Sequence, residues 1–365
     1  MRAIFEVWPA LEERVPWVEL GHFPTPIESL DAALDDIAGG QGRAWVKRDD
    51  RTSPIYGGNK VRTLEVLFGD AISKGATHIY STGAFGSNHA TATVLHAPAA
   101  GLKPGAVLFP QPRSDTAVAN LKAILQARPQ LLALPHWSTL PIGIWAARRR
   151  HGAGGRSAVM VPGGATPLGG LGYVSAGLEL AMQVRDGAAP APKEIIVGVG
   201  STCTTAGLLV GLHHAARQNI GWTTAPNVRA VRVTPWPVTS RRRIAWLARK
   251  VSLLLADLLG DPQAQIAYKT LLGSLQVDGR FLGKGYGFPT EGGHEAIARF
   301  ERLDGLKLDT TYSAKAAAAV VDAVKGQERG PLLYWATKST APLPEGDPDA
   351  LAQAPWLMRR WLGSV

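Results

Sequence analysis

The sequence predicts an α/β protein built on two open, twisted, mostly parallel sheets that are flanked by helices. Short runs of β-branched apolar residues alternate with Ala- and Leu-rich segments along most of the 365 residues, and this alternation favours parallel strands joined by helical crossovers. The chain is long enough for a large core or for two domains. Hydrophobic residues make up 45% and charged residues 19%, which is typical of a folded globular protein rather than a disordered chain.

Local patterns justify each element in turn. Val61, Leu64 and Phe68 share one side of a helical repeat. Gly75 should end that helix, and Pro98 should shorten or kink the next one. The expected strands are AWVKRDD (44–50), THIYSTG (77–83), AVLFP (106–110), SAVMVPGG (157–164) and EIIVGVG (194–200), and the expected helices are VRTLEVLFGDAISKGA (61–76), NHATATVLHAPAA (88–100) and TTAGLLVGLHHAARQ (204–218).

The formal net charge is +10, which raises the question of nucleic-acid binding. The densest basic runs, 148–150 and 241–243, lie among Ala and Trp in segments that are expected to be helical. A solvated basic face of a helix is the simpler interpretation, so no nucleic-acid partner is expected. A basic protein still attracts carboxylates and phosphates through its overall field.

Other classes of protein are disfavoured. Every apolar run is interrupted by Gly, Pro or a charge, so no membrane span is expected, and the N-terminal segment does not resemble a secretory signal. Cys203 is the only cysteine, which excludes an intrachain disulfide and favours the cytoplasm. No metal is expected, because His89, His213 and His214 have no partners at a convincing metal-ligand spacing.

The segment VGVGSTCTTAGLL (197–209) has the pattern of an anion cradle. An apolar strand ends at Gly200, small hydroxyl and thiol residues follow, and a helix begins. The N–H groups at a helix N-terminus, its dipole and the hydroxyls of Ser201, Thr202, Thr204 and Thr205 together favour a phosphate. The spacing is not that of a nucleotide P-loop. The alternative is an ordinary strand-to-helix turn with a capping threonine.

The segment STGAFGSNHATAT (81–93) delivers polar residues to a second helix start. Ser87 is a candidate nucleophile or proton carrier, and Asn88 is a candidate to orient a ring oxygen. The alternative for both is helix capping. A serine hydrolase is not favoured, because the spacing differs from the G-x-S-x-G elbow.

The segment SPIYGGNKVRTLE (53–65) places Lys60 at a Gly-rich corner before a helix. Burial and nearby N–H groups at such a place disfavour the ammonium form, which lowers the pKa of the amine and lets it form a Schiff base. Gly57 and Gly58 are expected to let a flat ring lie against the backbone. The alternative is a surface charge.

These motifs resemble those of one family in order and spacing. The similarity, over about Gly21 to Leu343, is to the pyridoxal-phosphate enzymes that include D-cysteine desulfhydrase and 1-aminocyclopropane-1-carboxylate deaminase. More broadly, the sequence resembles those of proteins with the tryptophan synthase β-subunit-like fold. The motifs that carry the resemblance are GGNKVRTLE (57–65), GSNH (86–89), VPGGATPLGGLGYV (161–174), the Gly200 loop, GYGFPTEGGHEAI (285–297) and LDTTYSAKAAAAVVDAV (308–324).

The resemblance implies a pyridoxal 5'-phosphate cofactor and a role for each matching residue. Lys60 would hold the cofactor as a Schiff base and move the α-proton of the substrate, with Asn59 beside it at the cofactor. Ser87 would lie over the cofactor as a nucleophile or hydrogen-bond donor, and Asn88 would bind the ring hydroxyl. The remaining residues are those of the phosphate cradle (Gly200, Ser201, Thr202, Cys203, Thr204), two tyrosines facing substrate and ring (Tyr286, Tyr312), and two hydroxyls at the ring nitrogen (Ser313, Thr337).

The expected reaction follows from these hydroxyls. A neutral partner such as Ser313 or Thr337 leaves the pyridine less fully protonated than a carboxylate would, which favours β-elimination over cyclopropane ring opening. The leading hypothesis is a lyase or deaminase that releases ammonia and a 2-oxo acid from a small amino acid such as D-cysteine. The alternatives are the cyclopropane-carboxylate deaminase, a β-replacement enzyme, and a basic nucleic-acid-binding protein that kept the scaffold without catalysis.

The sequence departs from the family around the substrate. The late HTGG or HLGG stretch becomes ATKS (336–339), which puts Lys338 and Ser339 where the family has glycines. Lys338 either meets an extra substrate carboxylate or points to solvent.

The expected organisation is a small domain, 61–170, inserted into a large domain made of 1–60 and 171–365, with the phosphate loop in the second part. The resemblance implies a homodimer. The Pro- and Trp-rich tail, 341–365, forms either a short helix or a subunit contact.

Overall fold

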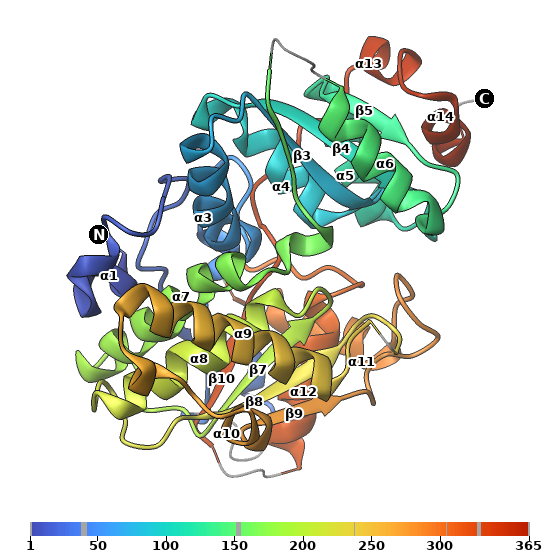
Figure 1. Cartoon of the computed structure of the whole chain (residues 1–365). Coiled ribbons are helices and arrows are strands. Elements are labelled where there is room, and N and C mark those ends of the chain that lie inside the picture. The colour runs from blue at the N-terminus through green and yellow to red at the C-terminus, as the bar shows by residue number, and fades with distance from the viewer. Residues whose placement is uncertain are drawn as a thin grey trace.

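The computed structural model describes residues 2–37, 42–150, 155–236, 238–303, 305–326 and 330–363. The chain forms two lobes, each built around one sheet with helices on its faces (Figure 1). The strands of the smaller sheet come from 78–159, and those of the larger sheet come from the flanking parts, 27–47 and 194–335. The predicted α/β class with two mostly parallel sheets is therefore confirmed.

The larger sheet has six strands in the order β1-β2-β10-β7-β8-β9, and only the β1–β2 pair is antiparallel. Its central strands are apolar on both faces because helices cover both sides. The strands are β1 (Ile27–Ser29), β2 (Ala44–Lys47), β7 (Glu194–Val199), β8 (Asn227–Arg232), β9 (Leu275–Asp278) and β10 (Leu332–Trp335).

The smaller sheet has four strands, all parallel, in the order β5-β4-β3-β6. Its long central pair is β3 (His78–Ala84) with β4 (Lys103–Phe109), and its edges are β5 (Gln130–Ala133) and β6 (Ser157–Val159). Parallel strands require crossover connections, and the intervening helices supply them. Around this sheet lie α3 (Lys60–Ser73), α4 (Asn88–His96), α5 (Asp115–Gln126) and α6 (Leu140–Arg149).

The core of the larger lobe lies on both faces of its sheet. On one face, α7 (Pro167–Arg185) and α8 (Cys203–Arg217) approach closely because both carry glycines at the contact: a Cβ on Gly211 would lie 2.4 Å from the carbonyl oxygen of Val174. The other elements of this lobe are α1 (Ala3–Val7), α2 (Asp31–Leu34), α9 (Arg241–Leu259), α10 (Tyr268–Gly273), α11 (Glu291–Phe300) and α12 (Ser313–Lys325).

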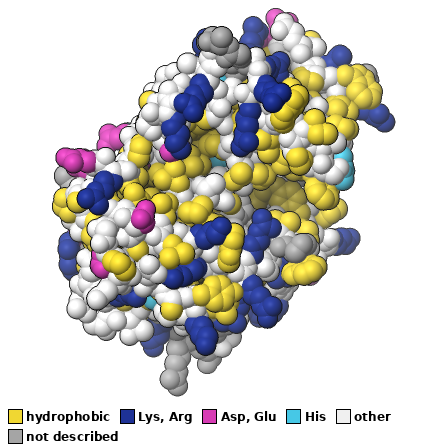
Figure 2. Space-filling view, viewed as in Figure 1, with side chains coloured by type: hydrophobic (Ala, Val, Ile, Leu, Met, Phe, Trp, Pro, Cys, Tyr) yellow, Lys and Arg dark blue, Asp and Glu magenta, His cyan; other side chains and the backbone are white. Residues whose placement is uncertain are grey.

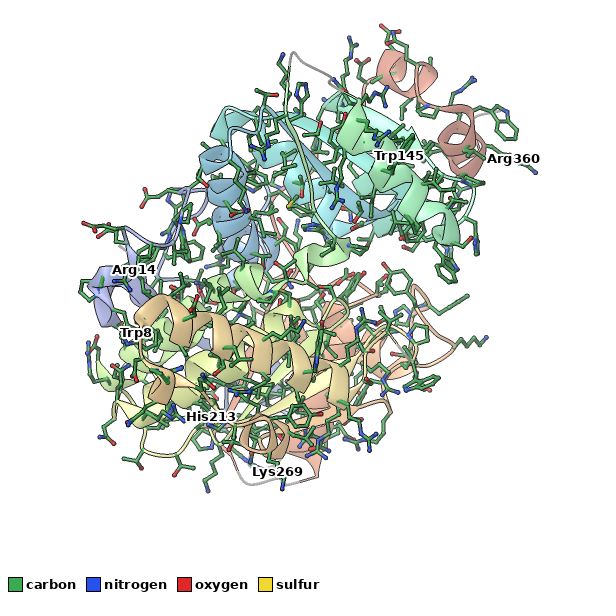
Figure 3. The ribbon with its side chains drawn as sticks, viewed as in Figure 1. Trp8, Arg14, Trp145, His213, Lys269 and Arg360 are labelled. Atoms are coloured by element: carbon green, nitrogen blue, oxygen red, sulfur yellow. The ribbon has the colours of Figure 1, made fainter. Side chains whose placement is uncertain are left out.

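The C-terminal tail does not join the larger lobe, contrary to the predicted range 171–365. Two short helices, α13 (Pro348–Ala352) and α14 (Trp356–Leu362), pack on the smaller lobe instead. Met358 is fully buried in one cluster with Phe85 and Leu121, and the Trp361 ring stacks edge-on against Phe85 at 5.7 Å between centroids. Burial of these apolar side chains explains why the tail passes from the larger lobe to the smaller one. Figure 3 shows Arg360 of the tail and Trp145 of α6 on the same lobe.

The sequence expectations for individual elements are confirmed. The strands β2, β3, β4, β6 and β7 lie within the expected segments or overlap them, as do the helices α3, α4 and α8. Gly75 takes a positive φ of 73° just after α3, and α4 ends two residues before Pro98. Among the described residues, every helix is too short or too polar to cross a membrane.

Candidate active site

A cleft with a volume of about 490 Å³ opens between the two lobes. Its walls come from the carboxyl ends of parallel strands in both sheets. The last residues of three strands line it: Ala84 of β3, Phe109 of β4 and Val199 of β7. Ligands of open α/β sheets generally bind at this edge. Figure 2 shows a hollow with hydrophobic walls on this face, bordered by Lys and Arg side chains.

Most of the residues predicted for the site meet in this one cleft. Two do not line it. Cys203 is fully buried behind the turn, where its thiol donates to the Gly164 carbonyl at 3.3 Å, and Ser313 is buried beside Asp309. The predicted residues that line the cleft are Asn59, Lys60, Ser87, Asn88, Gly200, Ser201, Thr202, Thr204, Tyr286, Tyr312 and Thr337.

The turn before α8 forms an anion cradle. Thr202, the residue before the helix, takes a left-handed conformation with φ of 66°, which turns the chain sharply at the helix N-terminus. The Thr205 hydroxyl is buried and has no partner among the described residues. The Asn59 amide donates to the Thr204 hydroxyl at 2.9 Å. Helix dipole, N–H groups and a free buried hydroxyl fit a phosphate.

Lys60 meets this turn from the opposite lobe. It is the first residue of α3, and its Nζ donates to the Ser201 hydroxyl at 3.1 Å. Burial lowers the pKa of the Lys60 amine, and the nearby Cys203 only partly opposes this. Among the described residues no carboxylate pairs with Lys60. The amine therefore has the environment that produces the neutral, nucleophilic form.

His89 lies beside Lys60 in the cleft wall. Both of its ring nitrogens are buried without a partner among the described residues. Burial, together with the Lys60 charge, lowers the pKa of His89 to about 3. The ring is therefore neutral at physiological pH and adds no positive charge next to the amine.

The two glycines before Lys60 have a different role from the one expected. They do not line the cleft: a Cβ on Gly57 would lie 2.3 Å from the Asp50 carbonyl oxygen, and one on Gly58 would lie 2.6 Å from that of Thr337. The space that they leave is filled by the protein's own backbone. The glycines let three chain segments meet behind Lys60 rather than making room for a ring.

Asn88 is oriented by a chain of hydrogen bonds. Its side-chain oxygen accepts from the Tyr56 hydroxyl at 2.8 Å and from the Asn120 amide at 2.7 Å. Asn88 lines the cleft, and with its oxygen held by two donors its amide N–H groups are the atoms left to bind a ligand. Asn88 is therefore set up as a donor to an acceptor group in the cleft, such as a ring hydroxyl.

Ser87 is a helix cap that also lines the cleft. It is the residue before α4, its hydroxyl accepts from the Ala90 N–H at 3.3 Å, and it also lines the cleft. The backbone of Gly83 lies so close that a Cβ there would be 2.8 Å from the Ser87 hydroxyl. This close approach fixes the serine at the end of β3.

Tyr286 and Tyr312 form a pair on the cleft wall. Their hydroxyls share a hydrogen bond, and their rings meet edge-on at 5.7 Å between centroids. Burial raises the pKa of both phenols, so both are neutral at physiological pH. The Tyr312 ring also lies against Gly200, which connects the pair to the anion cradle.

The two hydroxyls expected at a ring nitrogen are placed differently from each other. Thr337 lines the cleft. The Ser313 hydroxyl instead donates to the Asp309 carboxylate at 2.6 Å, and that carboxylate also accepts the Ser313 N–H at 2.8 Å. Of the two, Thr337 is the hydroxyl that a ligand in the cleft can contact.

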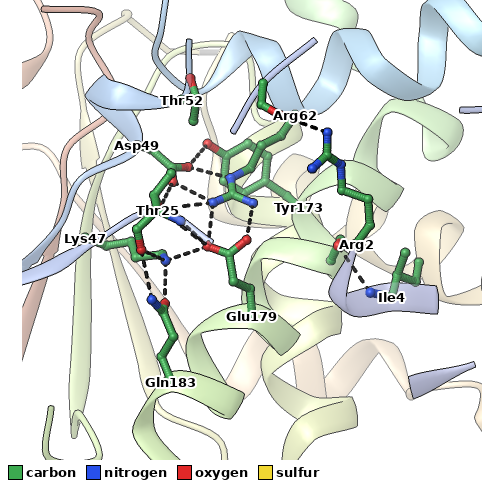
Figure 4. A network of polar contacts seen from close by, with 12 residues as sticks. Arg2, Ile4, Thr25, Lys47, Asp49, Thr52, Arg62, Tyr173, Glu179 and Gln183 are labelled. Atoms are coloured by element: carbon green, nitrogen blue, oxygen red, sulfur yellow. Dashed lines mark hydrogen bonds and ion pairs between the residues drawn. The ribbon is translucent and has the colours of Figure 1, made fainter. Parts of the chain in front are cut away.

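A buried ionic network holds the first turn of α3 against the larger lobe (Figure 4). Arg62, two residues after Lys60, donates to Asp49 at 2.8 Å and to Glu179 at 2.9 Å. Lys47 also donates to Glu179, and Tyr173 donates to Asp49. Burial opposes ionisation of Glu179, but Arg62 and Lys47 outweigh it and lower its pKa to about 2. The network fixes where Lys60 enters the cleft.

The site thus combines a desolvated lysine, an anion cradle at a helix N-terminus and a pair of neutral phenols. The chain matches the model of the pyridoxal-phosphate dependent enzyme family over residues 18–332 and belongs to that family. Pyridoxal phosphate is its cofactor. The Thr205 hydroxyl, which is buried and unbonded within the described part of the chain, the desolvated Lys60 and the Asn88 donor fit the phosphate, aldehyde and hydroxyl of that molecule.

More specific similarities are to two groups of proteins. The D-cysteine desulfhydrases of Salmonella newport strain SL254 and Salmonella heidelberg strain SL476 are each 32% identical over 330 residues, which is 88% of this chain and 93% of theirs. A solved structure described as an ACC deaminase homologue is 27% identical with a TM-score of 0.75, over 92% of this chain and 95% of that one. A threonine deaminase from Solanum lycopersicum, 14% identical over 93% of this chain and 85% of that one with a TM-score of 0.58, shares the fold.

Some residues of the site were not predicted from the sequence. Tyr56 and Asn120 orient Asn88, and Arg243 lines the cleft from the start of α9. Tyr56 stands four residues before Lys60, so its position in the motif was an available signal. Asn120 comes from a distant segment, and no local pattern marks it. Arg243 belongs to the basic run 241–243, which the charge pattern marked but which was interpreted as a solvated helix face.

Proposed function

We propose that this enzyme catalyses β-elimination from a small amino acid and releases ammonia and a 2-oxo acid, with D-cysteine as the first substrate to test. D-Cysteine and water would give hydrogen sulfide, pyruvate and ammonia. The proposal is supported by the 32% identity to D-cysteine desulfhydrases over 88% of the chain. It is also supported by Thr337, a neutral hydroxyl rather than a carboxylate in the cleft wall.

The proposed roles follow from the geometry. When bound, pyridoxal phosphate supplies an electron sink for charge that develops at the substrate α-carbon. Lys60 would bind the aldehyde and then move the α-proton, because its desolvated amine can be neutral. The turn at 200–205 would bind the phosphate, and the Asn88 amide would donate to the ring hydroxyl.

The remaining side chains would handle the substrate. Tyr286 and Tyr312 are neutral phenols that share one hydrogen bond, so either can donate a proton to a leaving group or hold the substrate in place. Ser87 would contact the substrate or the ring from the end of β3. The cleft walls are largely apolar, which excludes water from the reacting atoms.

The observation that carries the proposal is the 3.1 Å contact between the Lys60 amine and Ser201 in the anion cradle. It brings an amine and a phosphate site to the distance that one small cofactor can span. The test is an assay of the holoenzyme with D- and L-cysteine, D- and L-serine and β-chloroalanine, measuring sulfide, 2-oxo acid and ammonia. Turnover of D-cysteine to pyruvate and sulfide in equal amounts is expected, and no 2-oxo acid from any of these substrates would contradict the proposal.

A second candidate, opening of 1-aminocyclopropane-1-carboxylate, is favoured by the TM-score of 0.75 to an ACC deaminase homologue. The same assay separates the two, because this substrate would give a four-carbon 2-oxo acid. Adding an external thiol tests β-replacement, which would give a new amino acid instead of pyruvate. A homodimer in the cytoplasm is part of the proposal and is supported by the family resemblance. Light scattering of the holoenzyme tests the dimer.

A further inference from the structure

Lys338 occupies the cleft wall next to the segment that carries Lys60. It follows β10, and its backbone pairs with Gly58 in an antiparallel bridge. The N–H of Asn59 donates to the Thr337 carbonyl at 3.0 Å, and the Gly57 N–H donates to the Ser339 hydroxyl at 2.9 Å. These contacts hold the backbone on both sides of Lys338, so its side chain starts from a fixed point in the cleft.

The Lys338 ammonium has no counter-charge among the residues that the structure describes. Its Nζ donates to the Tyr56 hydroxyl at 3.0 Å and lies 5.0 Å from the centre of the Tyr56 ring. Among the described residues, no carboxylate lies within ion-pair distance of Lys338. An ammonium has three N–H donors, so one neutral acceptor leaves it under-satisfied, and a partly buried charge without a counter-ion is costly.

The charge on Lys338 is retained at neutral pH. Burial acts to lower the pKa of Lys338, but Tyr56 and Asp309 outweigh it, and the pKa lies above its ordinary value. Lys60 differs, because burial lowers its pKa. The two lysines of the cleft are thus suited to different tasks, one as a neutral amine and one as a fixed cation.

The other charges in the cleft leave this cation free for a ligand. Within the part of the chain that the structure describes, the lining contains Lys60, Lys338 and Arg243 but no Asp or Glu. Arg243 is exposed at the first turn of α9, so it lies at the mouth. The phosphate cradle is at the α8 N-terminus and involves Asn59 and Thr204 rather than Lys338.

We propose that Lys338, positioned by its hydrogen bond to the Tyr56 hydroxyl, forms a subsite for a second carboxylate carried on the side chain of the substrate. The enzyme then prefers amino acids with an acidic side chain to neutral ones of the same size. This inference rests on the proposed function, because it requires an amino acid to enter the cleft. The ammonium supplies two unused N–H donors, and the carboxylate supplies the missing negative charge.

The test compares aspartate with asparagine, which match in size and differ in charge. Each enantiomer, and alanine, is titrated into the holoenzyme, and dissociation constants come from the change in the absorption spectrum of the bound cofactor. Aspartate is expected to bind at least about tenfold more tightly than asparagine, the size of one charge-assisted hydrogen bond. In Lys338→Met the preference should fall to about twofold or less, while alanine binding should stay within about threefold.

Two controls make the result specific. Lys103→Met removes an exposed lysine at the amino end of β4. The cleft lies at the carboxyl end of this strand, so the variant should keep the preference for aspartate. Arg243→Gln removes the other ordinary cation that lines the cleft, and a preference lost in this variant but kept in Lys338→Met would assign the carboxylate to Arg243 and overturn the inference. Lys338→Gln repeats the test if the methionine variant does not fold.

Several outcomes would overturn the inference. One is a wild-type enzyme that binds aspartate no better than asparagine, and another is a preference that survives in Lys338→Met. A third is a Lys338→Met holoenzyme whose ligand-free spectrum shifts while the preference is unchanged, because the ammonium would then serve the cofactor. If neutral amino acids change the spectrum, amino acids do enter the cleft, and a failed subsite then leaves the proposed function uncontradicted. If no amino acid does, the proposed function fails with the inference.

Discussion

The two ends of the cleft are built in different ways. The anion cradle is made by one continuous stretch, in which β7 runs through Gly200 into α8 and the hydroxyls lie next to one another in sequence. The rest of the cleft, which is the substrate end in the proposed function, is assembled from side chains of distant segments, among them Asn88, Tyr286 and Lys338. In the proposed function, a local motif would bind the cofactor phosphate, and long-range packing would place the side chains that meet the substrate.

This difference teaches where specificity can change. The cradle depends on backbone N–H groups and a helix terminus, which few substitutions alter. The substrate end depends on individual side chains, so a single substitution there changes a contact directly. The departure at Lys338 lies at this second end. Variants at the two ends should therefore fail differently, the first by losing the cofactor and the second by losing turnover with the cofactor still bound.

The largest loss of turnover is expected for a substitution of Lys60, which contacts the cradle through Ser201. Lys60→Ala removes the amine that would bind the cofactor and move the α-proton, and should lower turnover by at least about 10³-fold. Turnover of 2-oxo acid per active chain is the measurement. Lys74→Ala, which changes an exposed lysine just after the same helix, should keep wild-type turnover. Equal activity in the two variants would remove Lys60 from the mechanism.

At the substrate end, Tyr286→Phe and Tyr312→Phe should each lower kcat by about 100-fold, the cost of losing one positioned donor. Cofactor affinity should not change. Because the two hydroxyls bond to each other, the double variant should lose little more than either single variant. A double variant whose loss equals the product of the two would show that the hydroxyls act independently.

At the cradle, Gly163→Ala tests how closely the turn is packed. A Cβ on Gly163 would lie 2.1 Å from the Ser201 Cβ, so Ser201 must move. The dissociation constant for pyridoxal phosphate, from fluorescence titration of the apoenzyme, should rise by about tenfold. Gly260→Ala is the matched control, since Gly260 has nearly the same φ (67° against 69°) but open space around it. A similar rise in both variants would mean that backbone strain, rather than the cradle, controls affinity.

The smallest effect is on acid stability. The pKa of His89 is about 3 in the folded protein against an ordinary value of 6.5, because of burial and the Lys60 charge. Below pH 6.5 the unfolded chain binds a proton that the folded one does not, so stability falls as pH falls towards 3. In His89→Leu apoenzyme this loss should be smaller by about 1.4 kcal/mol per pH unit between about pH 6 and 4, measured by urea unfolding.

The exposed His136 provides the comparison. The substitution His136→Leu measures what the replacement of a surface imidazole by a leucine does to urea unfolding by itself. If His89→Leu and wild type lose stability in parallel, His89 is protonated in the folded protein.

Features built from adjacent residues could be predicted from the sequence, whereas contacts between distant segments could not. The strand–turn–helix at 194–217 and the lysine at the start of α3 were readable because their residues are adjacent in the chain. The packing of the C-terminal tail could not be predicted in this way, because Met358 contacts Phe85 and Leu121, which lie far away in the sequence. The glycines at 57 and 58 were correctly singled out, but only the fold shows that they pack on Asp50 and Thr337.

The predicted ring-nitrogen contacts show the same limit. Ser313 was chosen by its place after Tyr312, and its hydroxyl is bonded to Asp309, four residues earlier. Nothing in the spacing distinguishes a serine that faces a ligand from one that bonds to a neighbouring carboxylate. Its contact with the cofactor stays a prediction.

The most direct test of the account is to fix the cofactor in place and locate it. The holoenzyme is reduced with borohydride, digested, and mapped by mass spectrometry. One pyridoxal phosphate per chain on Lys60 is the expected result, in the peptide that also carries Gly57 and Arg62. Attachment to Lys338 or to any other lysine, or no covalent label in a protein that retains its yellow colour before reduction, would contradict it.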